Sequence, residues 1–485
     1  MTRGPLSLRT DASWQVLEGF GRAVRAACRT VAPTDQEELL DVLDRAKAEG
    51  LSVTFRGHGR SYGDAALNAD GLVIDMTLLN RMLRWDPVAG IAEMEPGLTI
   101  EGLWRRTLED GWWPAVVPGT MWPTMGGCLS MNVHGKNNFA VGTFGEHVLD
   151  FDLVTPRGEW YRCSPRENAD IFYGAIGGLG LLGAITRVRL QMKQVDSGLL
   201  RVEALTGRNL DEVFDRFEQR LPESDYLVGW LDCLARGSAL GRGVLHRANY
   251  ITREEDAAWP RSFHTEQQRL PDTILGLPRS QLWRLMRPFV HNPGVRLINS
   301  LKYQASAFED GVTYLQSHVA FAFLLDYVPD WRLAYGDGGF IQYQVFIGHE
   351  AARSTLKTIL TLCQKKGLPS YLGVLKRHRP DPFLLSHALD GWSLAMDFRV
   401  TRANREALWA LTREMTACVL DAGGRFYFAK DAVLQPDEVR RAYGGDRLDR
   451  FAALKARLDP DTLLVSDLAR RALPSFSPRY APAHV

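Results

Sequence analysis

The amino-acid sequence predicts an α+β protein of two lobes, and three observations carry this prediction. A chain of 485 residues is too long for one ordinary core. Its first part alternates short strands with helices and glycine turns, whereas the middle part has longer strands rich in aromatic residues. The final stretch resembles the first part again. We therefore expect a first domain at 1–195, a second at 196–424, and a return of 425–485 to the first.

Composition excludes several classes of protein. The 58 Lys and Arg residues balance 57 Asp and Glu, and a net charge of +1 gives no overall field that would attract nucleic acid. The hydrophobic share of 45% and the charged share of 24% are those of a soluble globular protein. We expect a folded protein that does not bind nucleic acid.

The cysteines and the N-terminus indicate a reducing, cytoplasmic setting. Six cysteines lie far apart, without the close Cys and His spacing of a structural zinc site, so we expect reduced, buried thiols and no metal. The start, MTRGPLSLRTDASW, carries Arg3, Arg9 and Asp11 before any apolar run, which argues against a signal peptide.

The elements of the first part follow from hydrophobic spacing. Apolar residues at helical spacing predict helices, and short apolar runs next to glycine predict strands. In chain order we expect a helix at 35–48, strands at 52–55, 72–76 and 90–94, a helix at 99–108, a hairpin of 148–154 with 159–163, a helix at 168–178 and a strand at 186–192. The middle part has predicted strands at 340–347, 370–375 and 392–400.

The stretch Phe55–Asp64, FRGHGRSYGD, follows a predicted strand and contains three glycines. Glycine leaves backbone N–H groups unobstructed, so this loop can cradle a phosphate. A Rossmann dinucleotide site would need glycine at position 62, where the chain has Tyr62, and no amphipathic helix follows at once. A plain turn is the alternative interpretation.

A second glycine-rich stretch, Val116–Asn138, makes a cofactor site the better interpretation of the first. It contains PGTMWPTMGG and then HGKN, too rich in Gly, Pro and Thr for one regular element, so we expect a long ordered loop with a short helix inside. Two such loops can bracket one pyrophosphate.

FRGHGRSYGD, PGTMWPTMGG and HGKN, in this order, resemble the flavin domain of the vanillyl-alcohol oxidase and p-cresol methylhydroxylase superfamily. GFIQYQ, GRFYFAKD and the terminal SDLARR are similar to the decaprenylphosphoryl-β-D-ribose 2-oxidase family within it. The resemblance implies a PCMH-type FAD-binding fold with a substrate-binding cap domain on an antiparallel sheet. It assigns FAD to Phe55, Arg56, Gly57, His58, Gly59, Arg60, Ser61, Tyr62, Gly63, Asp64, Gly119, Thr124, Met125, Gly126, Gly127, His134, Gly135, Lys136, Asn137, Ile185 and Tyr427.

The resemblance also bears on how FAD is attached. Superfamily members with covalent flavin use a histidine in the first loop, and by alignment their histidine falls where this chain has Arg60. We therefore expect FAD to be bound without a covalent bond. His58, two residues earlier, is expected to donate a hydrogen bond to a phosphate or a ribose.

Lys430 is the candidate catalytic residue. Oxidation of an alcohol by flavin needs a base or a cation that faces the substrate. We expect Phe426, Phe428 and Lys430 to share one strand face, where desolvation among rings would lower the pKa of the lysine. A solvated lysine paired with Asp431 is the alternative. The resemblance implies an active-site lysine here, with Tyr427 and His134 as further catalytic residues.

The candidate substrate-binding residues lie mostly in the middle part of the chain. Gln342 and Gln344 lie on one strand face and can bind sugar hydroxyls, although a solvent-facing pair has the same pattern. The resemblance adds Lys136, Lys376 and Lys430, and Trp230 as a pocket wall or a core residue. One departure from the family is Ala395, where relatives have cysteine, and Ser393 replaces an amide.

The resemblance implies oxidation of the 2-hydroxyl of a polyprenyl-phosphoryl pentose. The keto product would pass to a short-chain dehydrogenase/reductase on the way to lipid-linked arabinose for the cell wall. A soluble alditol or aldonolactone oxidase, or a non-catalytic flavin-binding scaffold, are the alternatives. The segment Thr273–Phe308 has five basic residues and no Asp or Glu, so we expect either peripheral contact with an anionic membrane or a solvent-facing connection.

Overall fold

The computed structural model describes residues 12–274 and 276–476. The part of the N-terminus that bears on a signal peptide, residues 1–11, lies outside the described residues. The first domain begins with a four-stranded sheet of order β1-β2-β4-β3, in which β3 and β4 pair in parallel. Its strands are β1 (Ser13–Glu18), β2 (Arg25–Val31), β3 (Val53–Arg56) and β4 (Leu72–Asp75). The predicted helix is α2 (Gln36–Ala48), which begins where the Asp35 side chain accepts a hydrogen bond from Glu38 N.

A second sheet completes the framework of the first part. Its order is β5-β6-β10-β8-β9, and the predicted hairpin is confirmed as β8 and β9. The strands are β5 (Met82–Asp86), β6 (Ile91–Met94), β8 (Val148–Val154), β9 (Trp160–Cys163) and β10 (Ala184–Gln191). The helices beside it are α3 (Ile100–Thr107), α4 (Met125–Ser130) and α6 (Ala169–Ala175). The short helix expected within the long loop is therefore α4.

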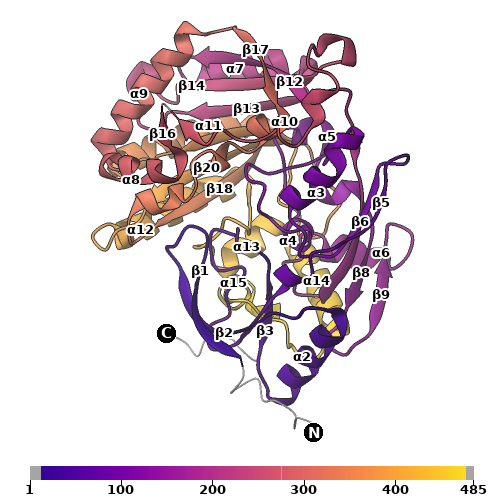
Figure 1. The fold of residues 1–485 in the computed structure, drawn as a ribbon. Helices are drawn as coiled ribbons and strands as arrows, with labels where there is room; N and C mark the ends of the chain where they lie inside the picture. Colours follow the sequence, from indigo (N-terminus) through magenta and orange to yellow (C-terminus); the bar gives the residue numbers. More distant parts are fainter. Residues whose placement is uncertain (1–11, 275, 477–485) are drawn as a thin grey trace.

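The middle of the chain forms an antiparallel sheet of eight strands, drawn in the upper half of Figure 1. Its order is β17-β12-β14-β13-β19-β20-β18-β21. The strands are β12 (Leu199–Gly207), β13 (Tyr226–Leu231), β14 (Gly243–Tyr250), β17 (Thr313–Ser317), β18 (Phe340–Gly348), β19 (Gly373–His378), β20 (Gly391–Arg399) and β21 (Arg425–Phe426).

Helices cover one face of this sheet. Three helices contact its central strands: α7 (Leu210–Arg220), α11 (His349–Lys365) and α12 (Arg405–Asp421). Phe214 and Phe217 of α7 pack against Trp392, with ring centroids 4.5 and 4.8 Å apart. The side chains on the other face of the central strands are therefore free to line a site.

The last section of the chain returns to the first domain, where Figure 1 draws its helices in yellow in the lower half of the molecule. These helices are α13 (Pro436–Tyr443), α14 (Gly445–Leu458) and α15 (Asp467–Ala472). Val53 N donates to Leu463 O, and Val465 N donates to Val53 O, both at 2.8 Å. The first two residues of this section, Arg425 and Phe426, still pair with β18 of the eight-stranded sheet.

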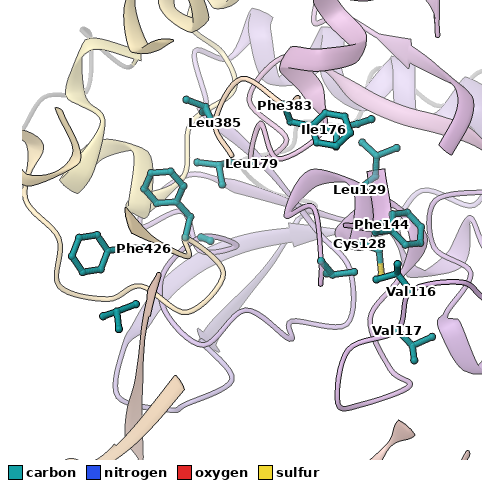
Figure 2. Packing of buried hydrophobic residues seen from close by; sticks show 14 of the residues in the cluster. Val116, Val117, Cys128, Leu129, Phe144, Ile176, Leu179, Phe383, Leu385 and Phe426 are labelled. Atoms are coloured by element: carbon teal, nitrogen blue, oxygen red, sulfur yellow. The ribbon is translucent and has the colours of Figure 1, made fainter. Parts of the chain in front are cut away.

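The buried core continues from one part of the molecule into the other. Figure 2 shows Cys128 and Leu129 of α4 near Phe144, and Phe383 from the middle part beside Ile176. A Cβ at Gly145 would lie 2.4 Å from Ile176 and 2.6 Å from Phe383, so this contact leaves no spare volume. The six cysteines, which include Cys128, are free, and only Cys418 among them is not fully buried.

Two predicted elements differ from the observed ones. The interpretation that Phe426, Phe428 and Lys430 share a strand face is wrong, because β21 ends at Phe426 and a turn follows, in which Lys430 N donates to Tyr427 O at 2.9 Å. The turn forms because Ala429 O accepts from Tyr62 N of the glycine-rich loop at 2.8 Å. The strand expected at 370–375 is β19 at 373–378, since the residues before it bond to Asp397 instead.

No helix within residues 12–274 and 276–476 combines the length and the apolar character that a membrane crossing requires.

Candidate active site

A cavity of about 450 Å³ lies between the eight-stranded sheet and the glycine-rich loops of the first domain. It brings together residues that are hundreds of positions apart in the chain. The predicted site residues that line it are Phe55, Arg56, Gly57, His58, Gly59, Arg60, Ser61, Tyr62, Gly119, Thr124, Gly126, Gly127, His134, Lys136, Ile185, Trp230, Gln342, Gln344, Lys376, Tyr427 and Lys430.

Five residues assigned to FAD do not line the cavity, and each has a structural role instead. A Cβ at Gly63 would lie 1.7 Å from Asp431 O, so glycine permits a close backbone approach there. Asp64 pairs with Arg471. Met125 is fully buried in the core. Gly135 packs against Asn137, whose Nδ2 donates to Ala115 O at 2.8 Å.

The first glycine-rich loop has the properties of an anion cradle. Among the described residues, none accepts a hydrogen bond from the backbone N–H groups of residues 58–61. Gly59 has a φ of +61°, a left-handed conformation that favours glycine. Gly57 lies against Thr124, where a Cβ would meet Oγ1 at 2.2 Å. The loop therefore presents successive free donors to the cavity, as a bound phosphate requires.

Arg60 lies beside two aromatic rings at the edge of the cavity. Its guanidinium carbon is 5.2 Å from the ring centroid of Phe20 and 5.9 Å from that of Trp122. Its buried Nε has no hydrogen-bond partner within the described part of the chain. His58 stacks on Trp122 with ring centroids 6.4 Å apart, and burial together with Arg60 lowers its pKa. A second cavity of about 590 Å³ borders the same loop residues.

Lys430 lies over the ring of Tyr62, with Nζ 3.5 Å from the centroid. Burial lowers the pKa of Lys430 to about 7. The charge of Asp397 raises this pKa, and the charge of the nearby Lys376 lowers it. The alternative pairing with Asp431 is wrong, because Asp431 forms its ion pair with Arg471 at 2.9 Å. Lys430 therefore carries an amine that can accept a proton near neutral pH.

The sheet supplies amide groups on the cavity side. Gln342 Nε2 donates to Asp397 Oδ1 at 2.6 Å, and burial raises the pKa of Asp397 to about 7. Gln344 Nε2 lies 3.1 Å from His134 Nε2, within hydrogen-bond distance. Burial lowers the pKa of His134 well below its usual range, with Lys376 and its histidine neighbours adding to the effect. These contacts hold both amides and the imidazole in fixed positions and place the glutamines in the cavity rather than in solvent.

Comparison with known proteins agrees with this geometry. The profile of the FAD binding domain family matches residues 28–164. The chain is 32% identical over 467 residues to decaprenylphosphoryl-β-D-ribose oxidase of Mycolicibacterium smegmatis, across 94% of this chain and 96% of that protein. The chain belongs to the decaprenylphosphoryl-β-D-ribose oxidase family. As a member of this family it is an FAD-dependent oxidoreductase with the PCMH-type FAD-binding fold.

Other relatives of this oxidase-family chain cover less of it or are less similar. An uncharacterised protein from the mprA 5′ region of Streptomyces coelicolor is 28% identical over 77% of this chain and 99% of its own length. Cytokinin dehydrogenase 5 of Arabidopsis thaliana is 34% identical over 40% of this chain and 36% of its own length.

The cavity of this oxidase-family protein fits FAD. The free N–H groups of residues 58–61 suit the two phosphates, and apolar side chains at the first-domain end of the cavity, among them Phe55, Met76 and Ile185, suit the flat adenine. In this protein, the loops around Gly57 and Thr124 would hold the cofactor. His134 and Tyr427, which pack with ring centroids 5.2 Å apart, would contact its ring.

Two basic residues that line the cavity of this oxidase-family member were not predicted as site residues. His246 of β14 was not singled out, and Lys302 was grouped with a surface that faces a membrane. Lys302 belongs instead to the cavity, where its Nζ lies 4.2 Å from the ring centroid of Trp230. Helical spacing could have placed Lys302 on the inner face of its helix, because Lys302 lies seven positions after the buried Val295 and three after the buried Asn299.

We expect that acid precipitation of this oxidase-family protein releases all of its yellow colour into the supernatant, because Arg60 occupies the position of the covalent tether. The absorbance of supernatant and pellet at 450 nm checks this. Colour retained in the pellet of the wild type but released from a His58→Ala variant would assign a covalent link to His58.

Proposed function

We propose that this protein oxidises the 2-hydroxyl of a polyprenyl-phosphoryl pentose, most simply the ribose form, to a ketone. The name of the Mycolicibacterium smegmatis relative supports this substrate, given similarity along nearly the whole of both chains. One observation on this protein carries the proposal. Among the described residues that line the cavity, every charged side chain is basic and none is Asp or Glu.

The basic residues exceed what the cofactor alone requires. The pyrophosphate of FAD accounts for charge at the loop of residues 58–61, but Lys136 and Lys376 lie on the substrate side. Burial lowers the pKa of Lys136 to about 7 and that of Lys376 to about 8, since no carboxylate compensates them. An anionic group on the substrate would restore these charges, and a neutral alditol would not. This favours a phosphorylated sugar.

The residues near Lys430 suit the chemistry of alcohol oxidation. FAD, when bound, accepts the hydride from the carbon that carries the hydroxyl. The neutral amine of Lys430 accepts the hydroxyl proton, because its pKa of about 7 leaves it partly deprotonated at neutral pH. The amides of Gln342 and Gln344, fixed by Asp397 and His134, orient the sugar through hydrogen bonds to its other hydroxyls.

Different parts of the chain are proposed to bind the cofactor and the substrate. In this proposal the described residues of 1–195 and 425–485 form the cofactor lobe, and those of 196–424 form the substrate lobe. A 2-keto pentose is a carbonyl compound, so a reductase of the short-chain dehydrogenase/reductase class would consume it and return the epimeric, arabinose-type alcohol. A polyprenyl substrate also requires access to a membrane.

We further propose that the surface of residues 282–308 contacts an anionic membrane. Its exposed apolar residues include Leu285, Phe289, Leu297 and Leu301. Arginines alternate with them, no acidic residue interrupts the segment, and this combination suits an anionic bilayer surface.

We expect the protein to pellet with phosphatidylglycerol vesicles at low salt and to be released by high salt, because salt screens surface charge pairing. Phosphatidylcholine vesicles are the control. A Leu297→Asp/Leu301→Asp variant should stay in the supernatant. Equal pelleting of this variant and the wild type would remove the surface from the proposal.

We expect a polyprenyl-phosphoryl ribose to bleach the flavin in the absence of oxygen, whereas xylitol and an aldonolactone leave it oxidised. The loss of flavin absorbance in an anaerobic cuvette measures this. Bleaching by xylitol, without bleaching by the lipid-linked sugar, would show a soluble alditol oxidase. Failure of every alcohol to bleach a yellow protein would favour a flavin-binding scaffold.

We expect Lys430→Ala to retain FAD but to reduce it at least about 100-fold more slowly with substrate, as loss of a general base predicts. In the wild type the reduction rate should rise as pH increases through about 7, because only the deprotonated amine is a base. Stopped-flow reduction between pH 5.5 and 9 checks both. Lys365→Ala, on an exposed stretch of α11, is the matched control. Near-normal reduction by Lys430→Ala would exclude this role.

A further inference from the structure

Helix α9 (Asn292–Phe308) carries one basic residue into the cavity. Its inner face contains Val295 and Asn299, which are buried, and Lys302 continues this face by one more turn. Arg296, on the same helix, is exposed and does not line the cavity. Figure 1 shows α9 along the side of the upper sheet, beside β14.

Lys302, His246 and Trp230 line the same cavity, and His246 lies on β14 next to the strand that carries Trp230. Lys302 Nζ lies 4.2 Å from the ring centroid of Trp230, and the described residues offer Lys302 neither a carboxylate partner nor a hydrogen-bond acceptor. Burial lowers the pKa of His246 to about 4, and the charges of Lys302 and Lys136 lower it further. The imidazole of His246 is thus neutral and can donate a hydrogen bond, and the charges that act on it favour an anion in this part of the cavity.

Several hydrogen bonds hold α9 in place, so Lys302, whose side chain lines the cavity although the residue is exposed, extends from a fixed stretch of backbone. Asn299 Nδ2 donates to Asp232 Oδ1 at 3.0 Å, and Arg242 bridges Asp232 and Ser300 at 2.9 Å each. At the start of the helix, Tyr371 OH donates to Asn292 Oδ1 at 2.9 Å. These bonds tie α9 to the strands beneath it.

The register of the sheet gives the distance from this corner to the amide groups. Gln344, Ala395, Val374 and Trp230 are direct cross-strand neighbours in successive strands, and all four line the cavity. Three strand spacings separate Gln344 from Trp230, or about 14 Å. A pentose 1-phosphate that is hydrogen-bonded at both ends has a comparable length, since each hydrogen bond adds about 3 Å.

We propose that Lys302, above the ring of Trp230, and His246 on the neighbouring strand form the subsite for the phosphate of the substrate, while the sugar lies over Ala395 and Gln344. This inference rests on the proposed oxidation of a phosphorylated sugar and locates its charged group. The same helix turns Leu297, Ile298 and Leu301 outward, so the group esterified to the phosphate leaves the cavity beside an exposed apolar face.

Lys136, another candidate for the phosphate, is already engaged. Its Nζ donates to Phe321 O and lies 4.3 Å from the centroid of the Phe321 ring. It is also fully buried, and Leu227 N donates to its carbonyl at 3.1 Å. Lys136 thus fixes the segment around Phe321. Its positive charge also acts on His246 of the subsite.

The test measures binding and turnover separately. Geranyl phosphate, which has no sugar to oxidise, is titrated into the oxidised holoenzyme and followed by isothermal calorimetry. We expect Lys302→Gln to weaken its binding by about 10- to 100-fold, as loss of a charge-assisted hydrogen bond predicts, and Lys302→Arg to restore most of it. Arg296→Gln, the matched control on the same helix, should bind as the wild type does.

For turnover of the lipid-linked pentose, Lys302→Gln should raise KM by a similar factor and leave kcat within about twofold, because the phosphate is bound equally in the ground and transition states. His246→Gln should have a smaller effect in the same direction. Flavin content confirms that each variant folds.

The two proposals can fail separately. Binding of geranyl phosphate that depends on Lys302, without oxidation of the lipid-linked pentose, would refute the proposed substrate and support the anion subsite. Oxidation of the pentose with an unchanged KM in Lys302→Gln would support the substrate and overturn the subsite. Weakening by Arg296→Gln equal to that by Lys302→Gln would also overturn it, since it would show a general effect of surface charge.

Discussion

One guanidinium group joins the glycine-rich cofactor loop to the turn that carries Lys430. Arg471 of α15 forms ion pairs with Asp64, at the end of the glycine-rich cofactor loop, and with Asp431, directly after Lys430. Both carboxylates are nearly buried, so loss of either pair would leave a charge in a low-dielectric environment, which costs far more than breaking a surface pair. Because Asp431 also accepts from Val433 N and Leu434 N, the turn that presents Lys430 has one stable form. The position of the reactive amine therefore depends on the C-terminal helix.

A cavity lined only by basic charges is unfavourable when empty. Burial desolvates the ammonium groups of Lys136, Lys376 and Lys430 and lowers their pKa values, and the charge of Lys376 adds to this effect at the other two. A ligand that brings negative charge relieves it, so the cofactor and an anionic substrate stabilise the folded protein by binding only to that state. The same basic residues thus lower the stability of the unliganded protein and raise its affinity for anionic ligands. A neutral molecule of similar shape lacks this electrostatic contribution to binding, so the site selects anionic ligands over neutral ones.

Local sequence patterns predicted most of the strands, helices and cofactor loops. Glycines after a strand marked the cofactor loop, and the Thr- and Gly-rich stretch marked the loop that contains α4. Patterns of period two located β18 and β20 because both faces of these strands are determined by packing. Features set by distant contacts were not predictable: the turn at Lys430 exists because Tyr62 bonds to Ala429. Lys302 was misplaced since its helix has an apolar outer face as well as an inner one, and composition does not distinguish them.

The order in which the chain is synthesised gives the return of the C-terminal section a further meaning. Backbone bonds join Val53, in the strand that precedes the cofactor loop, to Leu463 and Val465, more than 400 residues later. More than 400 residues must therefore be synthesised after β3 before the flavin domain can complete these bonds. Until then the nascent domain exposes one side of β3, and contacts of such large sequence separation form slowly. The flavin domain is therefore completed only after the whole eight-stranded sheet has been synthesised.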